Sequence, residues 1–281
     1  MKFQLIAFAL FILSYTGSGS KNIQFLPLST GEQVNHQYYI LSYNEDTEQA
    51  NWVLYKLTSD MLAGETERDG NFRNDPLVAT KSASTKDYTN SGYDRGHLCP
   101  AADMKFNEKA MYESFYMSNI SPQLPGFNRG IWKELETQVR DWARGKDSLY
   151  IVTGPIFDET VESIGTNKVR IPVAFYKILY GPEKKEMIAF NMPNKASESP
   201  LETFTSTVDN LEEITGIDFF SQLPDNMEEQ LESKVNTADW FVSPLATSLA
   251  TKFENRDIWL VIGIVLVILF MYLLIRKSNK R

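Results

Sequence analysis

Thiol and imidazole side chains are scarce in this sequence of 281 residues, which contains one cysteine, Cys99, and two histidines, His36 and His97. A single cysteine excludes an internal disulfide framework and a cysteine-rich structural zinc site. Because nitrogen and sulfur ligands are so few, any bound metal must be held mainly by oxygen. The composition therefore favours a hard cation such as Mg²⁺ over zinc.

An excess of positive charge is also missing. The formal net charge is −8, which is unfavourable for a protein that binds a polyanion. Much of the negative charge lies in one segment, since residues 195–257 carry 13 acids and 4 bases. Several cations lie between residues 126 and 170. They would form a positive groove if they lined one cleft, and the alternative is that they are solvated charges on helix surfaces. These residues are Arg129, Lys133, Arg140, Arg144, Lys146, Lys168 and Arg170.

The segment Asp94-Arg95-Gly96-His97 concentrates reactive side chains. Histidine has the side-chain pKa nearest neutrality and can take a proton from water at working pH. Arginine presents a fixed fork of donors that suits a phosphate. Gly96 permits a backbone turn between the two. A capped turn with a solvated histidine is the alternative interpretation of these four residues alone.

Further motifs follow in a fixed order. Residues 118–123 read Ser-Asn-Ile-Ser-Pro-Gln, and residues 127–136 read Phe-Asn-Arg-Gly-Ile-Trp-Lys-Glu-Leu-Glu. Together with blocks at residues 93–104, 150–157 and 215–220, this set resembles the DNA/RNA non-specific endonucleases of the ββα-metal superfamily. The resemblance extends over residues 24–224.

The order of predicted elements indicates an α+β body. Alternating and apolar runs predict strands at residues 38–43, 52–57, 150–152, 171–179 and 187–191. Helices are predicted at residues 58–63 with Thr58 as cap, at 107–115, from 127 onward and at 211–215, with a long loop at 64–92. The resemblance implies a central antiparallel β-sheet with flanking helices and a ββα-metal active-site finger.

The resemblance also implies roles for three residues. His97 matches the general base that deprotonates a water molecule, and Asn128 matches the family's metal-ligating asparagine. Glu136 matches a glutamate that holds a metal-bound water; it follows Asn128 by eight residues, on roughly the same helix face. The spacing points Glu134 away from that face. A helix cap for Asn128 and a surface ion pair for Glu136 remain the alternatives.

Other residues are assigned supporting parts. The resemblance implies that Arg95 binds or stabilises the scissile phosphate and that Asn119 supports the histidine, and we expect Arg129 to bind substrate as well. Cys99 is interpreted as a packing residue. His36 lies outside every motif, and we expect it at the surface or at a strand edge.

Both ends of the chain are hydrophobic. Residues 1–20 predict a signal peptide, with Lys2 before an apolar run and small residues at 16–20, although an uncleaved anchor is the alternative. Residues 258–275 are 18 residues without charge, about 27 Å as a helix, which predicts a transmembrane helix. The basic tail 276–281 is then cytoplasmic. A membrane-anchored nuclease domain at 21–224, joined by an acidic linker at 225–257, would face the periplasmic or extracellular side.

These observations predict a metal-dependent endonuclease that hydrolyses phosphodiester bonds of DNA and RNA with little sequence preference. The expected cofactor is Mg²⁺, with Mn²⁺ as a second candidate. The expected partners are the two nucleic acids, a membrane through the C-terminal helix, and a second copy of the chain, since endonuclease G-like relatives are often dimers. The alternatives are a phosphodiesterase for nucleotides or other small diesters, a non-catalytic membrane-tethered nucleic-acid receptor, and a structural envelope protein.

Overall fold

The computed structural model of the protein describes residues 24–160 and 162–241. Of the described residues, those up to Val235 belong to one compact unit, and residues 236–241 belong to a second. Within the described residues, no helix is both long enough and apolar enough to cross a membrane. The predicted signal peptide and transmembrane helix lie outside the described residues.

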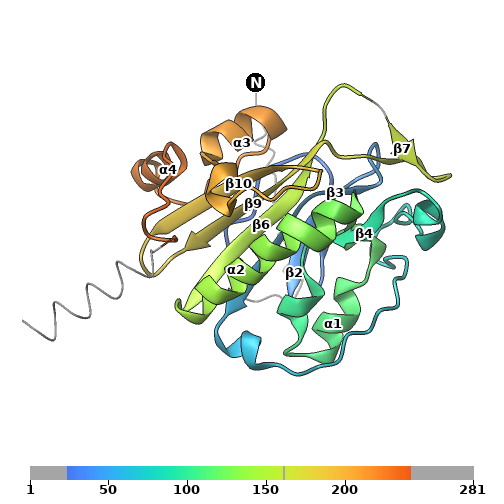
Figure 1. Ribbon diagram of the computed structural model, residues 1–281, viewed down its shortest axis with the longest axis horizontal. Helices are drawn as coiled ribbons and strands as arrows, with labels where there is room; N and C mark the ends of the chain where they lie inside the picture. The colour runs from blue at the N-terminus through green and yellow to red at the C-terminus, as the bar shows by residue number, and fades with distance from the viewer. Residues whose placement is uncertain (1–23, 161, 242–281) are drawn as a thin grey trace, which may run out of the picture. The chain divides into compact units, whose positions relative to one another are not determined.

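A seven-stranded antiparallel sheet forms the body of the first unit, in the order β1-β2-β3-β6-β9-β10-β11 (Figure 1). Its strands are β1 (Glu32–Asn35), β2 (Tyr39–Asn44), β3 (Gln49–Thr58), β6 (Ser148–Ile156), β9 (Ala174–Gly181), β10 (Glu186–Pro193) and β11 (Thr205–Ser206). Two short pairs lie outside it: β4 (Asp94–His97) with β5 (Ile120–Gln123), and β7 (Ser163–Ile164) with β8 (Val169–Arg170). The α-helices are α1 (Glu108–Ser114), α2 (Trp132–Arg144), α3 (Val208–Thr215) and α4 (Asp225–Glu232).

Helices cover both faces of the sheet, and the side chains of strand β9 show which helices lie on which face. Phe175 stacks against Phe127 and contacts Trp132 at the start of α2. The next residue, Tyr176, points to the other face and contacts Phe219, which follows α3. Because successive side chains alternate between the faces of a strand, β9 is buried along its whole length. The sheet therefore separates the α2 side from the α3–α4 side.

The amphipathic pattern of α2 explains how it packs. Leu135, Val139 and Trp142 are buried at spacings of four and three, as predicted for one face of a helix. The helix begins only at Trp132, because Gly130 has non-helical dihedral angles of φ −101° and ψ −117°. A separate π-turn, Phe127–Ile131, precedes it.

The prediction of an α+β body with a central antiparallel sheet is confirmed, with local corrections. In place of the helix predicted at residues 58–63, the chain forms a short 3₁₀ helix, Asp60–Ala63. Its N-cap residue is Ser59 and not Thr58. The strand predicted from residue 171 begins at Ala174. Helix α4 lies inside the segment predicted as an acidic linker, and Met227 and Leu231 pack against the core. Residues 225–232 therefore belong to the packed body.

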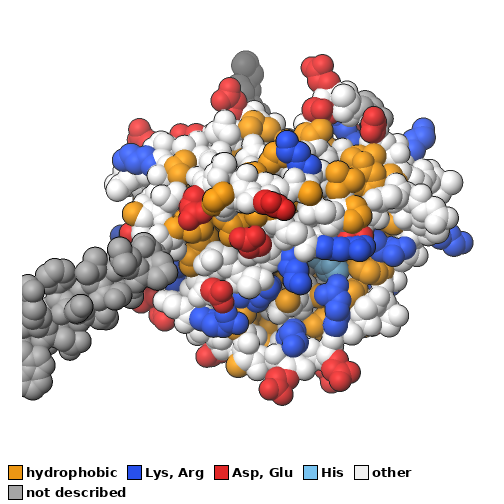
Figure 2. Space-filling view, viewed as in Figure 1, with side chains coloured by type: hydrophobic (Ala, Val, Ile, Leu, Met, Phe, Trp, Pro, Cys, Tyr) orange, Lys and Arg blue, Asp and Glu red, His pale blue; other side chains and the backbone are white. Residues whose placement is uncertain are grey.

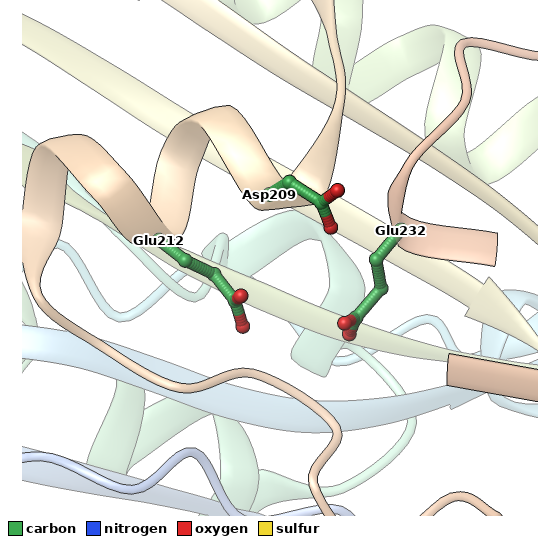
Figure 3. A group of neighbouring side chains, drawn as sticks. All are labelled: Asp209, Glu212 and Glu232. Carbon is green, nitrogen blue, oxygen red and sulfur yellow. The ribbon is translucent and has the colours of Figure 1, made fainter. Parts of the chain in front are cut away.

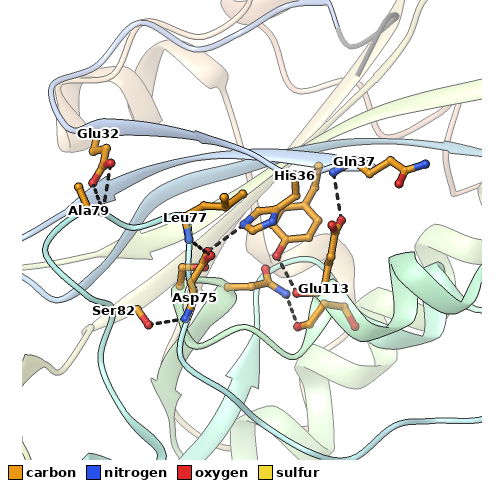
Figure 4. Close-up of polar contacts among 12 residues, drawn as sticks. Glu32, His36, Gln37, Asp75, Leu77, Ala79, Ser82 and Glu113 are labelled. Carbon is orange, nitrogen blue, oxygen red and sulfur yellow. Dashed lines mark hydrogen bonds and ion pairs between the residues drawn. The ribbon is translucent and has the colours of Figure 1, made fainter. Parts of the chain in front are cut away.

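His36 directly follows β1, which is an edge strand of the sheet, but the expectation of a surface position is wrong. Its side chain is fully buried, and Nε2 lies 2.9 Å from Oδ2 of Asp75 in the loop at residues 64–92 (Figure 4). Ser118 donates a second hydrogen bond to the same carboxylate, and Leu77 N–H donates to Oδ1. These bonds attach the middle of the loop to the sheet. An otherwise irregular loop thereby takes a defined path.

We expect Asp75→Ala to lower the free energy of unfolding by about 3 kcal/mol near neutral pH, because His36 and Ser118 lose a buried acceptor. Burial alone would raise the pKa of Asp75, but the bonds from His36 and Ser118 outweigh it and lower the pKa. The stabilisation is therefore present above the ordinary aspartate pKa and is lost as the pH falls through the lowered value. Urea unfolding of both proteins across acidic pH measures this, with the exposed Asp46→Ala as control. If the difference in unfolding free energy between Asp75→Ala and the wild type does not become smaller at acidic pH, the stabilising role of the ionised Asp75 is contradicted.

Candidate active site

The β4–β5 pair brings the first motif to the rim of a cleft. His97 pairs with Ile120, and Arg95 pairs with Pro122. Since side chains alternate along a strand, Arg95 and His97 point to the same side, and both line the cleft. Gly96, between them, faces Gln123 so closely that an added Cβ would lie 2.1 Å from its side chain. Glycine is therefore required here by the close approach of the neighbouring strand.

His97 is almost buried, with 8% of its surface exposed. Phe72 and Phe115 lie against its ring, with centroid distances of 5.4 and 5.0 Å. Burial, and then the charge of Arg68, lower the pKa of His97 to about 3. Its Nε2 atom has no hydrogen-bond partner among the described residues. The imidazole is therefore neutral near pH 7, and because Nε2 is buried, Nδ1 is the nitrogen that a water molecule in the cleft can reach.

Asn119 does not line the cleft but holds the backbone that follows His97. Its Oδ1 accepts from Cys99 N–H at 2.8 Å, and its Nδ2 donates to the carbonyl oxygens of Cys99 and Ser114 at 2.9 and 2.8 Å. Leu98 N–H donates to the Asn119 carbonyl. Asn119, which the resemblance predicts to support the histidine, is therefore a positioning residue. Cys99 is fully buried, and burial raises the pKa of its thiol, in agreement with a packing role.

Asn128 lies in the π-turn before α2 and lines the cleft. Its Nδ2 donates to Asp94 Oδ2 at 2.9 Å, and Arg129 donates to both oxygens of the same carboxylate. This contact orients the amide so that Oδ1 is left as an oxygen ligand. The cap of α2 is Ile131, with Gly130 between it and Asn128. The alternative interpretation of Asn128 as the helix cap is therefore wrong.

Glu136 comes from the second turn of α2 and also lines the cleft, whereas Glu134 is exposed outside it. Burial raises the pKa of Glu136 to about 7, while the charges of Lys177 and Arg140 oppose that rise. No ion pair among the described residues involves Glu136. Burial thus makes the carboxylate easier to protonate, and a cation bound beside it would oppose this effect, because a nearby positive charge stabilises the ionised form.

The cleft has a volume of about 440 Å³ and is lined by five cations and one carboxylate. The cations are Arg68, Arg95, Arg129, Lys133 and Arg140. Figure 2 shows Lys and Arg side chains gathered around a histidine on this face. A locally positive cleft therefore exists on an acidic protein. Arg144, Lys146, Lys168 and Arg170, from the same cationic region of the sequence, do not line it.

Two buried charges behind the cleft were not predicted from the sequence. Lys177 is fully buried on β9; its Nζ donates to Thr153 Oγ1 at 2.7 Å and lies 4.8 Å from the Trp132 ring centroid. Asp103 accepts from Tyr55 and Arg140 at 2.8 and 3.0 Å, which fixes the guanidinium of Arg140. A lysine inside an otherwise apolar strand was the available signal for Lys177. Nothing local in the sequence connects Asp103 with Arg140.

Comparisons with known proteins identify the family. The family model of DNA/RNA non-specific endonucleases matches residues 18–226. Human mitochondrial endonuclease G is 34% identical over 202 residues, which are 66% of this chain and 68% of that protein. Nuclease C1 of Cunninghamella echinulata is 35% identical over 216 residues, 70% of this chain and 86% of that protein. A chain in the crystal structure of the EndoG/EndoGI complex superimposes with a TM-score of 0.67 at 31% identity, covering 72% of this chain and 90% of that one.

We expect Asn119→Ala to lower the free energy of unfolding by about 3 kcal/mol, because it leaves three buried backbone groups without partners. Asn128→Ala removes one bond at the edge of the cleft and should cost less than about 1 kcal/mol. Urea unfolding of the two variants beside the wild type measures the difference. Equal losses would contradict the division of the two asparagines into a buried positioning residue and a cleft residue.

Proposed function

We propose, on the premise that this chain belongs to the DNA/RNA non-specific endonuclease family, that the cleft around His97 is where it hydrolyses the phosphodiester bonds of DNA and RNA. Family membership makes the protein a metal-dependent nuclease. The observation that carries the assignment of the site is a neutral histidine that lines a cleft together with five cations.

His97 acts as the general base. The ring nitrogen that is not buried, Nδ1, accepts a proton from a water molecule as the water oxygen attacks phosphorus. The bond from phosphorus to the 3′ oxygen breaks, and the leaving oxygen takes a proton from the solvent. Arg95 lies two residues away on the same side of β4 and is placed to bind the attacked phosphate. A guanidinium suits this task because its donors match two phosphate oxygens at once. Asn119 keeps His97 at the required position through its bonds to the adjoining backbone.

The cleft fits a hard cation. Asn128 offers Oδ1, because its Nδ2 is already donated to Asp94, and Glu136 supplies a carboxylate beside it that is suited to a metal-bound water. Oxygen ligands of this kind suit Mg²⁺, with Mn²⁺ as the second candidate. When bound, the ion stabilises the extra negative charge of the transition state and of the leaving oxygen. Strands β4 and β5 with helix α2 would then form the ββα-metal finger.

The shape and charge of the cleft favour a polymer over a small diester. Arg129 is 72% exposed at the rim even though it pairs with Asp94, and Lys133 is exposed on α2. Exposed cations beyond the reacting centre can contact successive phosphates of a strand. Contacts of this kind are made without base edges, so little sequence preference is expected.

Residues 258–275 are proposed to anchor the enzyme, with the catalytic unit on the periplasmic or extracellular side. In a membrane fractionation, the full chain should sediment with membranes and be released by detergent. A variant lacking residues 258–281 should stay in the supernatant. If the full chain also stays there, the anchor proposal fails. Sedimentation of the detergent-solubilised chain also tests the homodimer that the family resemblance implies.

We expect His97→Ala to reduce cleavage of plasmid DNA and single-stranded RNA by at least about 100-fold, because general base catalysis contributes about 10²–10⁴ in rate. Glu136→Gln should also lose activity, whereas Glu134→Gln, two residues away and outside the cleft, should retain it. The assay compares initial rates with Mg²⁺ and with EDTA.

Two outcomes would contradict the proposal. If the wild type binds both polymers without cutting either, the receptor alternative replaces it. If Glu134→Gln and Glu136→Gln lose activity equally, the assignment of Glu136 to the site is wrong. A wild type that cuts small diesters but neither polymer would favour the small-substrate phosphodiesterase.

A further inference from the structure

Three carboxylates outside the cleft converge between α3 and α4. Asp209 and Glu212 lie on one face of α3, and Glu232 is the last residue of α4. One oxygen from each lies within 4.8 Å of the others, and Figure 3 shows the three side chains directed toward a common space. The sheet separates this cluster from α2, because α3 and α4 pack on the face that carries Tyr176.

Glu232 points into this cluster from a buried position. It is 3% exposed, and its Oε1 is buried without a hydrogen-bond partner among the described residues. Burial, and then the neighbouring acids, raise the pKa of Glu232 to about 9. A buried carboxylate oxygen without a partner is rare in native proteins and requires a ligand or a proton. Glu212 is held in place, since its Oε1 accepts from Phe219 N–H at 2.7 Å.

No basic residue of the surrounding segment can neutralise the cluster. Residues 208–232 contain eight acids and no lysine or arginine. Among the described residues, no ion pair involves Asp209, Glu212 or Glu232. Three like charges at this separation repel strongly when partly desolvated. The arrangement therefore needs a proton or a cation that the described residues do not supply.

We propose that Asp209, Glu212 and Glu232 bind a Ca²⁺ ion that joins α4 to α3. The ligands are all carboxylate oxygens, the chemistry of a hard cation, and no histidine or cysteine is present to favour zinc. Ligands of one Ca²⁺ can lie up to about 5 Å apart, whereas those of Mg²⁺ reach only about 4 Å. A spread of up to 4.8 Å thus fits Ca²⁺ without movement. Asp209 is exposed, so water can complete the coordination.

The expected consequence is stabilisation of the C-terminal part of the body rather than catalysis. Helix α4 packs on the core through Met227 and Leu231, and the ion would add a link at its last residue. The proposal does not depend on the proposed function, because the two sites lie on opposite faces of the sheet. A loss at one site can therefore be told from a loss at the other.

The test is thermal unfolding of the purified full chain, stripped with EGTA and then given Ca²⁺ or Mg²⁺. It is performed in an Asn128→Ala background, so that the catalytic cleft contributes little. At about ten times the dissociation constant, Ca²⁺ should raise the Tm by about 4 °C, and Mg²⁺ should raise it less. Calorimetric titration should give one Ca²⁺ per chain.

Glu232→Gln and Asp209→Asn should each remove most of the shift, whereas Glu213→Gln, an exposed acid on the same helix, should keep it. Asp209 is itself exposed, so its variant remains informative if Glu232→Gln fails to fold. The proposal is overturned if Ca²⁺ raises the Tm of the Asp209 and Glu213 variants equally. It is also overturned if Ca²⁺ has no effect on the parent and Glu232→Gln is more stable, since Glu232 then holds a proton instead.

Discussion

The carboxylate of Asp94 is the contact on which the geometry of the cleft depends. It lies at the start of β4, three residues before His97, and it accepts from Asn128 and from Arg129 in the turn before α2. The two halves of the cleft are thus joined across 34 residues of sequence. The contact fixes the Asn128 amide relative to the strand that carries His97. A charge-assisted bond suits this task because it is short and directional.

Burial gives the cleft its chemical character. The aromatic rings of Phe72 and Phe115 exclude water from His97 and keep it neutral beside arginines. On α2, burial raises the pKa of Glu136, and the buried Lys177 opposes that rise. Charges in such surroundings interact more strongly than in water. The same effect acts on the other face of the sheet, where Glu232 is buried among acids and no described residue supplies a counter-charge.

Much of the body was predictable because its signals are local. The stripe of Leu135, Val139 and Trp142 identified α2, and apolar runs identified the main strands. The boundary at residue 225 was misplaced because acidic composition suggested solvation, whereas Met227 and Leu231 are spaced to pack on the core. The short strands β4 and β5 were missed because each has four residues, and their polar sequences carry no alternating pattern.

The family could be identified from residue types at fixed spacing, and so could the candidate base. A metal site made of oxygen ligands could be predicted from the scarcity of cysteine and histidine. Which charges lie together could not be predicted, because it depends on the fold. Arg68 and Arg140 reach the cleft, whereas Arg144 and Arg170 do not, and His36 is buried against Asp75. Proximity between distant residues follows from strand order and helix packing, which composition and periodicity do not encode. Asn119 is an example of both kinds of information. The motif identified it as a site residue, and the fold shows that its side chain holds the backbone that follows His97.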